Sequence, residues 1–180
     1  MKTRWMLAAV AAAALAVVVI SGTAPGGLRV TGEAAAGVCD ANPKPANLNF
    51  TLKDVNGADV NLTMFKGKVV VLDFWATWCA PCKVEIPGFV ELYEKYKSRG
   101  LVVVGLSVDD TLEQLRPFVS QYKMNYPVLL GVGNDAIQEA YGPLWGLPTT
   151  FIIDRRGRIC AKHMGLTAKE QFENAILALL

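Results

Sequence analysis

Two short, mainly apolar runs predict the strands at the centre of the fold. VVVLDFW at 69–75 and LVVVGLSV at 101–108 are typical of strands that are buried on both faces of a sheet. After each run, apolar residues recur at every third or fourth position, which predicts a helix. The first helix should end at Gly100, and Pro117 should kink the second.

The remaining pattern predicts an α/β sandwich with a mixed β-sheet flanked by helices. Strand-like segments at 49–52 and 59–62 flank Asn56-Gly57, a pair that is typical of a hairpin turn. Strand and helix signals then alternate towards the C-terminus, as expected when helices cover a sheet. The later segments are strands at 127–130, 149–153 and 158–164, a short helix at 136–141 and a last helix after Thr167.

Two pairs of polar residues, each three positions apart, predict where helices begin. Asp110 with Glu113, and Thr167 with Glu170, have the spacing of capping pairs that satisfy free N–H groups in a first helical turn. We therefore expect one helix to start at Asp110 and the last helix to open on a capping box at Thr167.

The first 24 residues have the pattern of an export segment. Lys2 and Arg4 precede an apolar run at 5–20, which as a helix would span about 24 Å. Extension to residue 24 reaches about 30 Å, enough for a bilayer core. Cleavage remains an alternative, but Pro25 should hinder it. The basic N-terminus would stay in the cytoplasm and place the domain outside.

Length and charge limit the organisation and the partners of the chain. Its 180 residues suffice for one domain after the leader. Residues 25–45 are rich in Gly, Ala and Pro and predict a flexible linker, followed by a folded domain at 46–180. Eighteen basic and sixteen acidic residues leave a net charge of +2 without a basic stripe, which argues against nucleic acid as a partner.

Cys79 and Cys82 form a CxxC pair where the first buried strand turns into a helix. A structural zinc site usually needs four Cys or His ligands, but beyond the pair only three scattered candidates remain, and the sequence has no second CxxC motif. The strand–turn–helix setting also argues against two inert core thiols. We therefore predict a redox-active dithiol, with no metal site and no cofactor. The other candidate ligands are Cys39, Cys160 and His163, of which His163 is expected on the surface.

The position of the pair predicts a separate role for each sulfur. At the helix start, the Cys79 sulfur would face unpaired N–H groups and the positive end of the helix dipole, which favour the thiolate. Pro81 suits the first turn because its missing N–H costs nothing there. Cys82 follows by three residues, so both sulfurs fall within disulfide reach. We expect Cys79 to be exposed and to attack, and Cys82 to be shielded and to resolve.

These motifs resemble those of a known superfamily. WATWCAPCK at 75–83 is similar to the active-site segment of the thioredoxin superfamily. Together with CAPCKVEIP and YGPLWGLPTTFIIDRRGRI it resembles the TlpA/ResA-like branch of exported, often membrane-anchored thiol–disulfide oxidoreductases. The resemblance covers about residues 46–180 and implies a thioredoxin fold with an added N-terminal β-hairpin.

The resemblance also implies partners on the periplasmic side. They would be exported proteins with disulfides, among them apocytochrome c or copper-site proteins, and a membrane thiol electron donor. We expect the protein to act as a monomer. The Ala80-Pro81 dipeptide lacks the histidine that stabilises the reduced form of oxidising relatives, so a reductant is predicted.

Two acids are candidates for proton transfer at the dithiol. Glu85 lies three residues after Cys82, on the same helical face, where the branch carries a glutamate near the cysteines. Asp73 interrupts a buried strand and matches the buried aspartate of thioredoxins, although the branch more often has an uncharged residue there. We expect a shared role for the two acids. An ordinary solvated Glu85, or an edge-facing Asp73 bound to backbone, is the alternative.

The resemblance implies that Pro148 follows a cis peptide bond and lies opposite the CxxC pair. Leu147 would then offer its backbone to an extended substrate. The segment before Pro148 is about one residue longer than usual, so Trp145 could line this groove or pack in the core, whereas Trp75 is assigned to the core. The expected substrate-binding residues are Trp78, Pro81, Leu147, Pro148 and Thr149.

Cys39 and Cys160 are expected to form a structural disulfide that pins the linker to the domain. Lipidation of Cys39 is the alternative, but Val38 is a poor match to the small residue that such a site needs.

Two other functions of the protein remain open. A peroxiredoxin-like peroxidase would need a threonine where Ala76 stands, and a non-catalytic thioredoxin-like binding module would not need both active-site cysteines.

Overall fold

A computed structural model describes residue 39 and residues 42–180 of the chain. The predicted leader at 1–24 and most of the predicted linker at 25–45 lie outside the described residues. Within the described part, none of the helices is long and apolar enough to cross a bilayer. The last linker residues pair with the domain, since Pro45 forms an isolated β-bridge with Arg158.

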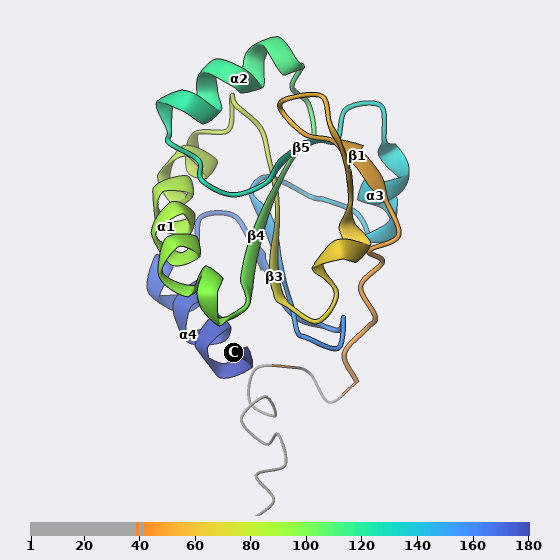
Figure 1. Cartoon of the computed structure of the whole chain (residues 1–180), viewed down its shortest axis with the longest axis vertical. Helices are drawn as coiled ribbons and strands as arrows, with labels where there is room; N and C mark the ends of the chain where they lie inside the picture. Colours follow the sequence, from red (N-terminus) through yellow and green to blue (C-terminus); the bar gives the residue numbers. More distant parts are fainter. Residues whose placement is uncertain (1–38, 40–41) are drawn as a thin grey trace, which may run out of the picture. The chain divides into compact units, whose positions relative to one another are not determined.

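Five strands form one mixed sheet in the order β5-β4-β3-β6-β7 (Figure 1). The central strand β3, Val69–Trp75, pairs in parallel with β4, Leu101–Ser107, and antiparallel with β6, Thr149–Ile153. The outer strands are β5, Val128–Leu130, and β7, Ile159–Met164. The expected α/β sandwich with a mixed sheet is confirmed.

One face of the sheet is covered by three helices. They are α1, Ala80–Tyr96, α2, Leu112–Gln121, and α4, Lys169–Leu179. Their apolar side chains meet every second residue of β3 in a single buried cluster. This alternation places Asp73 on the same face, beneath α1. The central strand is buried at every position, as its continuous apolar run predicts.

The other face is covered by the added hairpin and a short helix. Strands β1, Thr51–Lys53, and β2, Asp59–Asn61, pair antiparallel, as predicted from the Asn56-Gly57 turn. Their neighbour is α3, Asp135–Ala140 (Figure 1). Two short 3₁₀ helices, Leu62–Phe65 and Lys97–Arg99, complete the described elements. A second buried apolar cluster fills this side of the sheet.

Both predicted helix starts are wrong, because the Asp110 carboxylate and the Thr167 N–H form hydrogen bonds with residues far away in the sequence. Helix α2 begins one residue after Thr111, whose N–H donates to Gln114 Oε1 at 2.8 Å. Asp110 is instead buried, and its carboxylate accepts hydrogen bonds from the backbone N–H and the hydroxyl of Thr77, 33 positions away. Helix α4 begins after Ala168, and the N–H of Thr167 donates to Glu85 Oε1 on α1.

Candidate active site

The two CxxC cysteines lie at the start of α1 and are joined by a disulfide of 2.03 Å. Cys79 is the N-cap residue, and Ala80 and Pro81 occupy the first helical positions. The N–H of Cys82 donates to the Cys79 sulfur at 3.2 Å. After reduction this N–H, together with the positive end of the helix dipole, would stabilise a negative charge on Cys79. The geometry is therefore that of an N-terminal sulfur favoured as a thiolate.

The exposure of the two sulfurs differs from the expectation. Cys79 is only 3% exposed and Cys82 is 1% exposed, so the prediction of an exposed Cys79 is wrong for the oxidised form. Cys79 belongs to the buried apolar cluster beneath α1, and half-buried Leu147 packs against that cluster.

Two of the tryptophans considered from the sequence are exposed at the surface, and a third is buried. Trp78 is 62% exposed, and its Nε1–H donates to Asp109 Oδ2 at 3.0 Å. Trp145 is 82% exposed, which excludes the core packing that the sequence had left open. Trp75 is fully buried, as expected of a core residue. The exposed tryptophans provide apolar surface that a protein substrate could cover.

The Leu147–Pro148 bond is cis. Strand β6 begins at Thr149, which pairs with Phe74 on the central strand. Pro148 therefore lies at the end of the sheet where β3 leads into the CxxC segment. The Thr149 side chain is buried, and its hydroxyl donates to the Gly146 carbonyl at 2.7 Å. This side chain supports the turn before Pro148 from inside, and the assignment of Thr149 to substrate binding stays a prediction.

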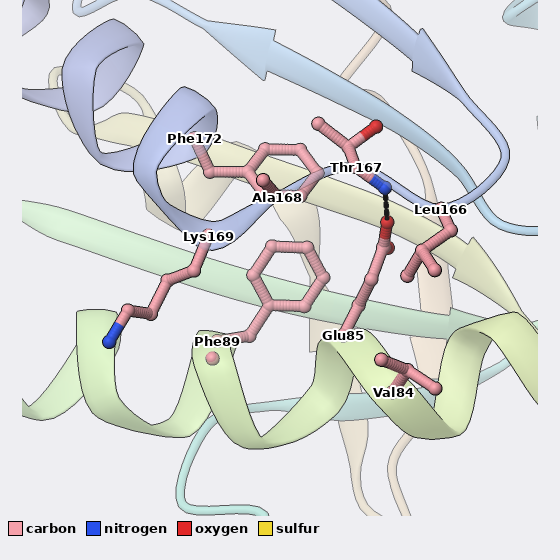
Figure 2. Close-up of a pocket in the computed structure, with 9 residues that line it drawn as sticks. Val84, Glu85, Phe89, Leu166, Thr167, Ala168, Lys169 and Phe172 are labelled. Atoms are coloured by element: carbon pink, nitrogen blue, oxygen red, sulfur yellow. Dashed lines mark hydrogen bonds between the residues drawn. The ribbon is translucent and has the colours of Figure 1, made fainter.

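Glu85 is buried between α1 and the segment that leads into α4. Figure 2 shows its carboxylate pointing from α1 towards Thr167, whose backbone N–H donates to Oε1. The second oxygen, Oε2, is buried without a hydrogen-bond partner among the described residues. Burial raises the pKa of Glu85 from 4.5 to about 7, although the Thr167 bond opposes this shift. The alternative of an ordinary solvated glutamate does not describe this side chain.

The same carboxylate lines a surface pocket of about 410 Å³. Apolar side chains from both helices form most of its wall, including Phe89 of α1 and Phe172 of α4 (Figure 2). The exposed side chains of Val84 and Leu166 stand at its rim. With its pKa raised to about 7, this acid is about half protonated near neutral pH.

Asp73 is the second buried acid beneath α1. Its Oδ1 accepts a hydrogen bond of 3.0 Å from the hydroxyl of Thr150, the residue opposite it on β6. Burial, and to a smaller extent the negative charge of Glu85, raises its pKa from 3.8 to about 8. Because the two acids influence each other, they titrate as a coupled pair. Asp73 is therefore not an edge-facing residue bound to backbone.

Several polar groups around Asp73 were not identified from the sequence. Tyr126 is buried, its hydroxyl has no partner among the described residues, and burial raises its pKa, with a further contribution from Asp73. His163 is half-buried with its ring centroid 5.0 Å from that of Phe172, so its predicted surface position is wrong. Burial lowers the pKa of His163. Only strand register brings these groups together, and it leaves no local sequence signal.

Cys39 and Cys160 are joined by a second disulfide. Cys160 is buried on β7, and the bond ties the chain ahead of residue 42 to that strand. A carboxylate oxygen of Asp154 lies within 4.8 Å of the two sulfurs, but disulfide sulfurs cannot act as thiolate ligands, so this group does not suit a metal. A Cys39 sulfur in this bond is also not available for lipidation.

Comparison with known proteins agrees with this site. Residues 44–162 match the AhpC/TSA family. The chain belongs to this family. Thiol-disulfide oxidoreductase ResA of Bacillus thuringiensis subsp. konkukian (strain 97-27) is 42% identical over 125 residues, which cover 69% of this chain and 71% of the relative. ResA of Bacillus subtilis (strain 168) is 39% identical over 111 residues, or 62% of this chain and 61% of the relative.

Solved structures confirm the thioredoxin fold of this AhpC/TSA family member. A thiol:disulfide interchange protein of the thioredoxin family from Chlorobium tepidum TLS superposes with a TM-score of 0.70 at 30% identity, covering 78% of this chain and 99% of that one. StoA from Bacillus subtilis gives a TM-score of 0.60 at 26% identity, covering 73% and 98%. The chain is an extracytoplasmic thiol–disulfide oxidoreductase. The peroxidase alternative finds no support in Ala76, which carries no hydroxyl.

Proposed function

We propose that this oxidoreductase is a membrane-anchored reductant that opens disulfides in exported proteins. The observation that carries the proposal is the CxxC pair at the start of α1 with two protonatable acids beneath it. Disulfides between the cysteines of apocytochrome c or of copper-site proteins are the substrates that the resemblance to ResA suggests. A membrane dithiol would return electrons to the pair.

The reaction proceeds through two thiol–disulfide exchanges. The Cys79 thiolate attacks one substrate sulfur, so a Cys79–substrate bond forms, the substrate disulfide breaks, and one substrate thiolate leaves. Cys82 then loses its proton and attacks the Cys79 sulfur, which releases the second substrate thiolate. Two electrons pass to the substrate, and the enzyme is left with the Cys79–Cys82 bond that the structure describes.

The pKa values of Glu85 and Asp73 suit the proton transfers that these two exchange steps require. With pKa values of about 7 and about 8, the pair holds between one and two protons near neutral pH. Its ionised fraction can accept the Cys82 proton, and its protonated fraction can return a proton to a leaving thiolate. A carboxyl group at its ordinary pKa would be almost fully ionised and would be a weaker base towards a thiol.

Trapping the mixed disulfide tests the proposed reaction. With Cys82→Ser, the bond between Cys79 and substrate cannot be resolved, so exported proteins should accumulate on the variant through a linkage that dithiothreitol releases. Mass spectrometry of the released proteins identifies the substrates. Cys79→Ser/Cys82→Ser is the control and should trap none. If the single variant, expressed with its leader, traps no more than this control, the reductase proposal is wrong.

A second experiment tests the proton-accepting role of Glu85. Glu85→Gln keeps an oxygen for the Thr167 N–H but cannot take up a proton. We expect kcat/KM for disulfide reduction to fall at least tenfold near pH 7, within the range typical of acid–base groups. The step in the pH–rate profile near pH 7 should also move or disappear. Glu94→Gln changes an exposed acid on the same helix and should leave the profile unchanged. An unaltered profile in Glu85→Gln would assign Glu85 a structural role only.

A further inference from the structure

The end of the sheet opposite the CxxC pair carries a group of exposed basic side chains. Lys66 and Lys68 lie in the turn before β3, and Arg155 and Arg156 lie in the turn between β6 and β7. Figure 1 shows both turns at the same, lower end of the sheet. The four side chains line one surface pocket of about 260 Å³. Lys44 lines a neighbouring pocket that shares Pro45 with this one, and these five basic residues together are called the basic end below.

Most of these charges have no acidic partner among the described residues. Asp154, the acid of this pocket, is already bound by Arg158 at 2.6 Å. Arg155 donates to the backbone carbonyls of Arg99 and Leu180. Elsewhere in the described chain, four lysines form an ion pair with a carboxylate, namely Lys53, Lys95, Lys97 and Lys169, whereas Lys83, Lys123 and Lys162 form none. The basic end therefore presents positive charge that the described chain does not neutralise.

The N-terminal part of the chain joins the domain at this same end. The Ala46 N–H donates to the Gly157 carbonyl, and the Ile159 N–H donates to the Lys44 carbonyl, both at 2.8 Å. The Cys39–Cys160 disulfide adds a covalent link to β7. All residues before 39, including the apolar run at 5–20, are thus connected to the domain through the basic end.

The dithiol lies at the far end of the central strand. Strand β3 runs from Val69, next to the Lys66–Lys68 turn, to Trp75, just before the CxxC segment. A strand of this length spans roughly 20 Å. Strand β6 runs the opposite way, from Thr149 after the cis-proline to Ile153 before the arginines. A surface in contact with the basic end would therefore leave the CxxC pair facing away from it.

We propose that the basic end binds the head groups of acidic phospholipids and so turns the CxxC pair away from the membrane. This inference rests on the proposed anchoring of the chain. The linker cannot fix the orientation by length alone, because residues 25–38 can extend to about 50 Å. Attraction of the basic side chains to an acidic bilayer surface can fix the orientation, because each basic side chain strengthens binding roughly fivefold.

The full-length chain in bilayer nanodiscs provides the test. Discs are made either of phosphatidylcholine alone or with acidic phosphatidylglycerol, and an amine-reactive label is followed at each lysine by mass spectrometry. Lys44, Lys66 and Lys68 should react at least tenfold more slowly in the acidic discs. Lys53 and Lys123, exposed and outside the basic end, should react equally in both. Equal rates at all five lysines would overturn the proposal.

Two further arms make the result specific. In Lys66→Glu/Lys68→Glu, Lys44 should lose its protection in acidic discs, whereas Lys53→Glu/Lys123→Glu should keep it. Inorganic phosphate added to phosphatidylcholine discs should not slow labelling; if it protects Lys66 and Lys68 as well as acidic lipid does, the pocket takes free anions and the lipid assignment is wrong. Co-purification with phosphatidylcholine discs reports the anchor separately, and reduction of a soluble disulfide, unchanged in both variants, reports the proposed function separately.

Discussion

Replacing Asp73 with asparagine is expected to remove much of the loss of stability that the oxidised domain shows as the pH rises from about 5 to 8. An acid whose pKa is higher in the folded than in the unfolded state keeps its proton only while the domain is folded. The folded state then binds more protons than the unfolded state between the two pKa values, so stability falls with rising pH in that interval. For Asp73 the interval runs from 3.8 to about 8.

The size of the effect follows from the shift. Each pKa unit corresponds to about 1.36 kcal/mol, which sets a ceiling of roughly 6 kcal/mol for the whole interval. Glu85 shares this titration, so part of the pH dependence should remain in Asp73→Asn. The asparagine oxygen can still accept the hydroxyl bond from Thr150, which limits the structural disturbance.

Urea unfolding of the oxidised protein at several pH values from 5 to 8 measures the difference. Oxidised cysteines do not titrate, and His163, whose folded pKa is lowered, contributes equally to wild type and variant. Asp135→Asn, at an exposed position, is the control and should follow the wild-type slope. The interpretation of Asp73 as a buried, protonated acid is wrong if Asp73→Asn loses stability with pH as steeply as wild type does.

Removing the Cys39–Cys160 disulfide is expected to lower the free energy of unfolding by about 2–5 kcal/mol. The bond joins residues 121 positions apart, so its loss frees a large part of the unfolded chain and favours the unfolded state. For a domain of this size the melting temperature should fall by roughly 5–15 °C. Disulfide reduction by the CxxC pair should be retained in Cys39→Ser/Cys160→Ser, because both sulfurs lie outside that site.

Thermal and urea unfolding of the double variant measure this effect. Cys79→Ser/Cys82→Ser provides the contrast, because its bond closes a loop between residues only 3 positions apart and should contribute much less to stability. That variant should lose all oxidoreductase activity. A Cys39→Ser/Cys160→Ser protein as stable as wild type would show that the bond does not stabilise the domain.

The sequence alone determined the features that depend on neighbouring residues. Continuous apolar runs predicted strands buried on both faces, and β3 and β4 form the centre of the sheet as expected. Asn56-Gly57 predicted the added hairpin, and the change from strand to helix placed Cys79 and Cys82 at a helix start. Such features follow from periodicity, turn preferences and spacing within a few residues, which are read directly along the chain.

Only the tertiary structure decided which polar groups meet across the fold. Asp73 is bonded to Thr150, 77 positions away, and Glu85 to Thr167, 82 positions away. The bond to Glu85 explains why the expected capping box at Thr167 is absent, and the burial of Asp110 explains why α2 starts later than predicted. A polar side chain or N–H near a helix start can serve a local cap or a distant partner, and strand register and helix packing, which no local pattern encodes, select between them.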